Sequence, residues 1–383
     1  MDFSLPEEVE MLRRMVRDYV KKRLEPLVQW VEEEDEIPGE IVREMAQMGF
    51  FGLPFPEEYD GAGVGELGYC VVMEELAAVN SAYGNLIGAH TGIAACSIFL
   101  DGTEEQKTRY LKPMCRGEEI GAFALTEPNA GSDAAAIETS ARREGDRYYL
   151  NGSKIWITNG DIADVVVVFA VTDKSLGPRG GVSAFIVEKA FPGFQVGTVD
   201  RKMGLRGSHT AELVFNECEV PRENVLGEVG SGFLTAMKAL DFGRIGLAAG
   251  ALGAAQKALE MSIQWARQRV QFGKPIAEFQ AIQWMLADMA VQIHAARLMT
   301  YHAASLVDAG QKVSREAAMV KLFASEMANK VIDKALQIHG GTGYMKEYSL
   351  ERMYRDARIL PIYEGTNEIQ RMVIARDLLK AGK

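Results

Sequence analysis

Residues 147–171 read RYYLNGSKIWITNGDIADVVVVFAV, and this stretch decides the fold class of the chain. It contains short runs of β-branched and aromatic residues, which are typical of strands. Asn151-Gly152 is a favoured dipeptide for a tight hairpin turn, so we expect a turn there. The strand-like runs lie too close together for helices to connect them: 147–150, 155–158, 165–171, 182–187 and 211–215. Residues 121–225 are therefore expected to form a mainly antiparallel sheet or barrel.

Helical patterns flank this β block on both sides. Residues 1–120 contain helix-like segments separated by prolines and glycines, at 7–29, 40–48 and 68–79. Along 314–339 apolar residues repeat at steps of three and four, and Ser314 is the expected N-cap. Four long helices fit the C-terminal part: 230–268, 278–308, 314–339 and 366–381.

The three blocks together predict an α+β multidomain protein. We expect an N-terminal α-helical domain over 1–120, a middle antiparallel β domain over 121–225 and a C-terminal four-helix bundle over 226–383.

The composition narrows the classes of function. The 383 residues are 48% hydrophobic and 25% charged, with a formal net charge of −11. This balance excludes a disordered or collagen-like chain and argues against nucleic acid or anionic lipid as a partner. No apolar run approaches the roughly 20 residues that a membrane span needs.

Cysteine usage and the first residues indicate the compartment. Cys70, Cys96, Cys115 and Cys218 lie far apart, and no histidine stands at metal-ligand spacing, so we expect reduced thiols and no metal site. The segment MDFSLP lacks the pattern of a signal or transit peptide. A cytoplasmic location is the expectation.

Residues 63–68, GVGELG, match the dinucleotide fingerprint G-x-G-x-x-G. The fingerprint must follow a buried strand, whereas the preceding segment 53–60 contains two prolines and lies in a helical block. We therefore interpret this match as a loop before a helix.

Two segments of the β block have groups suited to a ligand. Small residues follow Pro128 in the segment FALTEPNAGSD (123–133), where open backbone N–H groups could face an electron-rich ligand, although an ordinary turn has the same pattern. Trp156 lies in an alternating strand, where it can pack either on a planar cofactor or in the core.

Glu364 comes directly after the apolar run 359–363. Desolvation there would raise its pKa and make it a usable general base near neutral pH. Gly365 permits a close turn, and Thr366 can cap a helix that begins at Asn367. A carboxylate that only serves the capping loop remains an alternative.

Six segments now combine into one pattern: FALTEPNAGSD (123–133), NGSKIWITNG (151–160), KMGLRGS (202–208), RQRVQFGKPIAEFQ (267–280), QIHGGTGY (337–344) and YEGTNEIQR (363–371). Their sequences and their order resemble the acyl-CoA dehydrogenase family. The resemblance covers essentially the whole chain and implies that family's fold of helical, β and helical-bundle domains.

The resemblance implies FAD as the cofactor, with its ring between the β domain and the bundle. The residues implied to line the ring are Phe123, Leu125, Thr126, Gly131, Ser132, Trp156, Ile157 and Thr158. Those implied to meet its pyrophosphate and adenosine across a subunit boundary are Arg269, Gln271, Phe272 and Gln280, with Gln337, Gly340 and Gly341 of a facing chain. Thr366 and Glu368 are implied to complete the site.

The implied reaction converts a short- to medium-chain acyl-CoA into a trans-2-enoyl-CoA. Glu364 removes the α-proton, the β-hydrogen leaves as hydride to flavin N5, and the N–H of Glu364 is one donor to the thioester carbonyl. Some members carry the base on a bundle helix instead, where this chain has Gly243, so the base must be Glu364 if the chain is active. The implied substrate residues are Ser132, Asp241, Arg244, Glu364 and Gly365, and a structural role for Arg244 stays equally open.

The resemblance also implies partners. These are an acyl-CoA substrate, electron-transfer flavoprotein as electron acceptor, and further copies of the chain in a homotetramer built as a dimer of dimers. Use of oxygen, as in acyl-CoA oxidases, and a non-enzymatic binding role on the same fold remain open at this point. We expect neither a nucleic acid nor a membrane partner.

Overall fold

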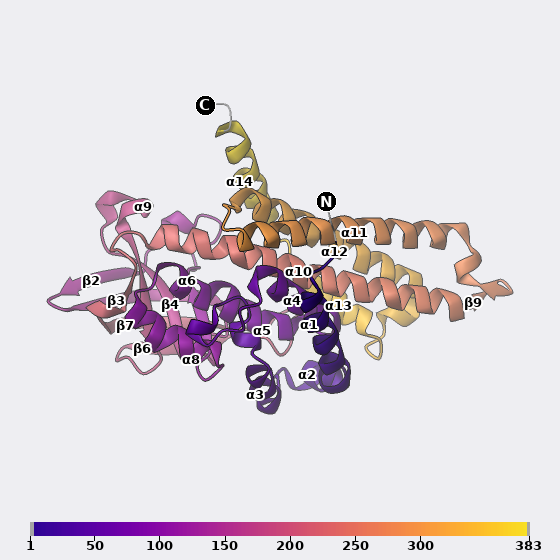
Figure 1. Cartoon of the computed structure of the whole chain (residues 1–383), viewed down its shortest axis with the longest axis horizontal. Helices are drawn as coiled ribbons and strands as arrows, with labels where there is room; N and C mark the ends of the chain where they lie inside the picture. Colours follow the sequence, from indigo (N-terminus) through magenta and orange to yellow (C-terminus); the bar gives the residue numbers. More distant parts are fainter. Residues whose placement is uncertain (1–3, 381–383) are drawn as a thin grey trace.

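The computed structural model describes residues 4–380, in which an eight-stranded sheet forms one end of the molecule and helices form the rest (Figure 1). The N-terminal block is helical, as expected, with several π and 3-10 turns labelled η. Its elements are α1 (Glu7–Tyr19), η1 (Val20–Leu24), η2 (Glu25–Leu27), α2 (Val28–Glu34), α3 (Gly39–Gln47), η3 (Phe50–Gly52), η4 (Glu57–Tyr59), α4 (Gly65–Val79), α5 (Ser81–Ile87), η5 (Gly88–Ala95), α6 (Cys96–Asp101), α7 (Glu104–Gln106), η6 (Lys107–Leu111) and α8 (Lys112–Cys115).

The sheet is mainly antiparallel, which confirms the expectation. The strand order is β6-β7-β3-β2-β4-β5-β8, while β1 pairs with β4 in parallel and β2 meets β4 in parallel at one residue pair. The strands are β1 (Gly121–Ala124), β2 (Ser140–Glu144), β3 (Arg147–Thr158), β4 (Val165–Val171), β5 (Val182–Glu188), β6 (Phe194–Val199), β7 (Thr210–Pro221) and β8 (Val225–Leu226). Short helical turns between them are η7 (Ala134–Ala136), η8 (Lys174–Leu176), α9 (Pro178–Gly181) and η9 (Arg222–Asn224).

The predicted hairpin turn at Asn151-Gly152 is wrong, because β3 runs through both residues as one strand. Its register against β7 shifts between Leu150 and Gly152, which marks a β-bulge. Gly152 has φ 145°, and a Cβ there would lie 2.8 Å from the Cα of Thr139. Glycine is needed here because neighbouring backbone approaches closely, and no turn forms.

The C-terminal block contains the four expected long helices and one further helix, α13. The helices are α10 (Gly232–Gln268), α11 (Gln280–Asp308), α12 (Ser314–His339), α13 (Ser349–Ala357) and α14 (Asn367–Lys380), joined by β9 (Val270–Gln271), β10 (Lys274–Pro275), η10 (Ile276–Glu278) and η11 (Gly340–Tyr344). The expected end of the last helix at residue 381 lies outside the described residues.

The prediction that Ser314 caps α12 is wrong. Val313 occupies the N-cap position, and Ser314 is the first helical residue. Its hydroxyl donates a hydrogen bond to the Asp241 carboxylate on α10, so the side chain serves a contact between helices.

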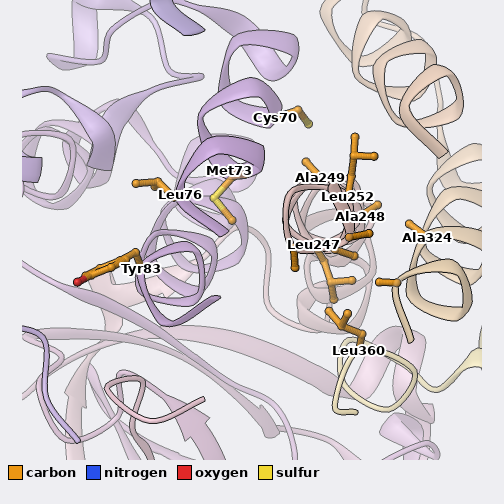
Figure 2. Packing of buried hydrophobic residues seen from close by; sticks show 14 of the residues in the cluster. Cys70, Met73, Leu76, Tyr83, Leu247, Ala248, Ala249, Leu252, Ala324 and Leu360 are labelled. Atoms are coloured by element: carbon orange, nitrogen blue, oxygen red, sulfur yellow. The ribbon is translucent and has the colours of Figure 1, made fainter. Parts of the chain in front are cut away.

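The N-terminal helices and the bundle share one hydrophobic cluster. In Figure 2, α4, which carries Met73 and Leu76, lies beside α10, which carries Leu252, and Ala324 of α12 is on the far side of α10. A Cβ on Gly253 would lie 1.9 Å from the carbonyl oxygen of Glu74, so the backbones of α4 and α10 are in contact. Small residues on α10 therefore allow this close packing, and α10 becomes the central helix of the molecule.

Candidate active site

Glu364 lies in the loop between α13 and α14, which turns sharply at this residue. Its φ is 53°, in the left-handed region that few residues other than glycine adopt, and Gly365 follows with φ 89°. The carbonyl oxygen of Glu364 accepts hydrogen bonds from Arg244 Nε at 3.1 Å and Gln370 Nε2 at 3.2 Å. Thr366 Oγ1 accepts from Ile369 N at 3.4 Å, so Thr366 caps α14 as predicted.

One oxygen of the Glu364 carboxyl group is enclosed and lacks a partner. This oxygen, Oε2, is shut off from solvent and forms no hydrogen bond within the described chain. Burial raises the pKa of Glu364 to about 7, against the lowering effects of Arg244 and Lys321. The prediction of a raised pKa from the apolar flank is thereby confirmed, and an unpaired carboxylate with this pKa can accept a proton near neutral pH.

Gly243 faces this carboxyl group from α10. A Cβ on Gly243 would lie 2.6 Å from Glu364 Oε2 and 2.5 Å from Ile93 Cγ2. The two positions that the sequence suggested for a base therefore meet at the same point in space. The glycine leaves room for the Glu364 carboxylate.

The predicted substrate residues of α10, Asp241 and Arg244, lie beside the Glu364 loop. Arg244 is buried, and its Nη1 donates to Asp241 Oδ1 at 2.9 Å while its Nε holds the Glu364 carbonyl. Both residues thus support the position of Gly365 and Glu364. Ser132 is exposed and belongs to the loop that follows β1.

The residues expected to line a flavin ring divide into two groups. Phe123, Leu125 and Ile157 are buried in the hydrophobic clusters, so their side chains pack away from solvent. Thr126 and Thr158 are partly buried, whereas Gly131, Ser132 and Trp156 are exposed. The N–H of Ile155 donates to the Thr126 carbonyl at 3.0 Å and joins this loop to β3.

Trp156 is exposed because of a second bulge in β3. The register against β7 shifts between Lys154 and Ile157, and Trp156 has φ 57°. The indole is 63% exposed, an unusual state for so large an apolar side chain. An exposed aromatic face beside a loop with small residues fits a planar ring such as the isoalloxazine of FAD.

The residues expected to meet the nucleotide end lie at the opposite end of the molecule. In Figure 1, β9 is at one extreme of the long axis and β2 and β3 are at the other. Arg269 stacks over Trp265, whose ring stacks on His339 with centroids 5.2 Å apart, next to Gly340. This exposed group contains Arg269, Gln271, Phe272, Gln280, Gln337, Gly340 and Gly341.

One chain therefore does not bring the two groups together. Phe272 is 94% exposed with φ 52°, and the Arg269 guanidinium is a planar fork suited to a pyrophosphate. Each group therefore fits one part of FAD, the ring or the pyrophosphate. Glu368, in the first turn of α14, is also exposed.

Sequence reasoning missed Lys321, Gln370 and Asn367, which surround the Glu364 loop. Lys321 and Gln370 are fully buried, and Asn367 is nearly so. The available signal was a lysine on the apolar face of α12, directly after Val320, because a buried lysine needs acceptors.

The remaining expectations concern metals and membranes. Over residues 4–380, no cluster of three or more His, Cys, Asp or Glu side chains could hold a metal ion. Within the same range, none of the helices combines the length and apolar character needed to cross a membrane.

Comparison with known proteins supplies a family context for this geometry. Models of the acyl-CoA dehydrogenase N-terminal, middle and C-terminal domains match residues 6–118, 122–218 and 230–379. A short-chain specific acyl-CoA dehydrogenase of Clostridium acetobutylicum is 48% identical over 380 residues, covering 99% of this chain and 100% of the relative.

Two further relatives show the same extent of similarity. A subunit of the caffeyl-CoA reductase-Etf complex of Acetobacterium woodii, CarC, is 47% identical and covers 98% of this chain and 99% of its own. The solved structure of butyryl-CoA dehydrogenase from Megasphaera elsdenii matches with a TM-score of 0.97 and 45% identity, over 99% of this chain and 100% of that one.

Proposed function

The chain belongs to the acyl-CoA dehydrogenase family, and from this premise we propose that it is an FAD-dependent enzyme that dehydrogenates short-chain acyl-CoA thioesters between Cα and Cβ. The observation that carries the proposal is the enclosed, unpaired Oε2 atom of Glu364, in a carboxyl group whose pKa burial raises to about 7. No protein group competes for its Oε2, so this atom is free to take the α-proton of a bound thioester.

Glu364 offers a second group to the substrate. Among residues 4–380, no acceptor takes the backbone N–H of Glu364, while its carbonyl is held by Arg244 and Gln370. A thioester α-proton is weakly acidic, so the carbonyl oxygen of the substrate must receive hydrogen bonds as negative charge develops. We assign this donation to the N–H of Glu364.

FAD, when bound, supplies the electron acceptor that takes the β-hydrogen with its electron pair. Trp156 and the exposed loop residues Gly131 and Ser132 would hold the ring, and Arg269 would pair with the pyrophosphate. Asp241 and Arg244 keep the base loop in position and border the thioester.

Reduction of a 2-enoyl-CoA is the second candidate, because CarC is named as part of a caffeyl-CoA reductase complex. The reverse reaction uses the same residues, with protonated Glu364 as the donor to Cα. A pKa of about 7 leaves both forms of Glu364 populated at neutral pH, so this carboxyl group can serve either direction.

We also propose the partners and the location. CarC is a subunit of a complex with an electron-transfer flavoprotein, and we propose a protein of that class as the electron partner. The two separated groups of FAD residues support a homotetramer built from dimers that share cofactor sites. All four cysteines are buried and free, which supports a reducing, cytoplasmic location.

An anaerobic titration tests the proposal. Purified protein is mixed with butyryl-, isobutyryl-, 2-methylbutyryl-, octanoyl- or palmitoyl-CoA while the visible flavin bands are followed, with Glu364→Gln alongside. We expect the short-chain thioesters to bleach the wild-type bands and to leave the variant unchanged. Admitting air then separates the oxidase alternative, which releases peroxide rapidly. Protein without flavin, or equal bleaching in Glu364→Gln, would overturn the proposal.

A further inference from the structure

Lys321 of α12 is buried and directed at the loop that carries Glu364. Its side chain has no exposed surface, and its Nζ donates to the Gly365 carbonyl at 2.8 Å and to Asn367 Oδ1 at 3.1 Å. Ser325, one turn further along α12, donates to the same Asn367 oxygen at 3.1 Å. The buried ammonium group therefore donates two of its three hydrogens to this one loop.

The loop needs such support because its backbone is unfavourable. Glu364 and Gly365 are consecutive residues with positive φ, and a non-glycine residue keeps this conformation only where its surroundings impose it. Buried donors from three elements converge on their two carbonyl oxygens: Arg244 of α10, Lys321 of α12 and Gln370 of α14. Lys321 is the one that fixes Gly365 and Asn367 together.

Lys321 also differs from Arg244 in its charge balance. Arg244 is paired with the Asp241 carboxylate, which offsets its charge. Within residues 4–380, Lys321 forms no salt bridge with an acidic side chain, and Glu364 is the first acidic group whose charge acts on it, followed by exposed Glu368. Tyr69 of α4 and Tyr363 also face Glu364, and both are neutral at pH 7.

We propose that Lys321 is a positioning residue for the base: its ammonium group holds the Glu364–Gly365 turn and supplies the uncompensated positive charge that stabilises the Glu364 carboxylate. The proposal rests on the function proposed above. Burial lowers the pKa of Lys321 to about 8, against the raising effect of Glu364, so the ammonium form prevails at pH 7. Loss of this charge is expected to make Glu364 harder to ionise.

The test compares Lys321→Met, Lys321→Arg and Lys330→Met in the FAD-loaded enzyme. Lys330 lies exposed on the same helix and is the matched control. The rate of anaerobic flavin reduction by butyryl-CoA is measured from pH 5.5 to pH 9.5. In the wild type and in Lys330→Met we expect the rate to rise with pH around pH 7, where Glu364 ionises. This rise is the acid limb of the pH–rate profile.

In Lys321→Met we expect the acid limb to move up by about one pH unit, because an opposite charge has been removed. The ionised fraction of Glu364 at pH 7 then falls from about half to about a tenth, so the rate falls about fivefold at pH 7 and recovers at high pH. Lys321→Arg, which keeps the charge, should return the limb towards pH 7. A uniform loss of rate with an unmoved limb would indicate a merely structural role and overturn the proposal.

Hydrogen–deuterium exchange of the ligand-free chain gives a readout that does not depend on activity. Amides of residues 362–370 should exchange faster in Lys321→Met than in Lys330→Met, since the carbonyl anchor is lost. If Lys321→Met does not fold, Lys321→Gln takes its place in both measurements, and an unmoved limb in it overturns the proposal. If no acyl-CoA reduces the flavin of the wild-type protein, the proposed function is refuted. Equal exchange in the two variants then refutes the role of Lys321 as an anchor of the loop.

Discussion

At the scale of single residues, the site depends on the absence of a side chain at Gly243. A Cβ there would lie 2.6 Å from Glu364 Oε2, so Gly243→Ala should displace the carboxylate. We expect the rate of flavin reduction to fall at least about tenfold, as small displacements of a reacting group do. Stopped-flow measurement with butyryl-CoA checks this.

The control for that change is Gly250→Ala on the same helix. A Cβ on Gly250 meets only the Cβ of Ala77, at an ordinary 3.6 Å. This variant should keep the wild-type rate and gain up to about 1 kcal/mol in unfolding free energy from helix propensity. Equal rates in the two variants would show that the Gly243 contact does not matter.

A second residue-scale prediction concerns Glu66, a buried carboxyl group of α4. Burial raises its pKa to about 8, and its Oε1 has no hydrogen-bond partner within the described chain. Because the folded chain keeps this proton while the unfolded chain releases it, stability is full below the unfolded pKa and falls as the pH rises towards 8. The loss is of the order of 4 kcal/mol.

Glu66→Gln removes this titration, so the variant should exceed the wild type in stability at pH 8, by a margin that shrinks at pH 5. Urea-unfolding midpoints at the two pH values measure the difference. Glu58→Gln is the control, since Glu58 is exposed. Parallel pH dependence in all three proteins would be incompatible with a raised pKa at Glu66.

Single residues also mark the limit of prediction from sequence. The raised pKa of Glu364 was predictable because its apolar neighbours are adjacent in the chain. The contact of Lys321 with Gly365 was not, because these residues are far apart in sequence and meet only through the packing of α12 against the loop. Local composition can predict that a side chain is buried, whereas its hydrogen-bond partners depend on the tertiary arrangement.

At the scale of elements, the bulges of β3 determine which side chains of the sheet are exposed to a ligand. Alternation in 155–158 predicted a strand correctly, but Asn151-Gly152 was interpreted as a turn. The same dipeptide suits a hairpin and a bulge, and only the partner strand separates the two. The helix α13, at 349–357, was missed because only long helices were expected in the C-terminal block.

The pair between Lys154 of β3 and Glu127 gives an element-scale prediction. Lys154 Nζ lies 2.7 Å from Glu127 Oε1 and also donates to the Leu125 carbonyl, so it fastens the expected flavin loop to the strand. Both side chains are buried. Lys154→Met leaves the Glu127 carboxylate buried without its cation, which should cost about 3–5 kcal/mol in unfolding free energy and lower the FAD content.

The double variant Lys154→Met, Glu127→Gln separates charge from packing. Removing both charges should recover part of the lost stability, because the single amide oxygen of a glutamine at position 127 can still accept from the N–H of Glu138 or of Thr139. Chemical denaturation and flavin absorbance per chain measure the two effects. A double variant as unstable as Lys154→Met would argue against an unpaired charge as the cause.

At the scale of the whole molecule, α10 sets the distance between the base and the nucleotide residues. It runs unbroken through 37 residues, with Gly243 in its first third and Arg269 directly after its last residue. At 1.5 Å per residue, these two positions lie about 40 Å apart along the helix. The sequence predicted the three blocks in order, and the expected helix over 230–268 already implied this separation. It could not show that the Glu364 loop packs against Gly243, because packing partners are properties of the assembled chain.

This separation leads to a prediction about assembly. If each FAD site takes Trp156 from one chain and Arg269 from another, Trp156→Ala and Arg269→Ala each damage every site in a homo-oligomer. In a mixed pair, one site receives both wild-type residues and the other receives neither. Random pairing of co-expressed chains should therefore restore about a quarter of the sites. Flavin content and butyryl-CoA reduction of the co-expressed protein measure this recovery against the two variants purified alone and then mixed without exchange. Sites built within one chain would show no recovery, because neither variant could complement the other.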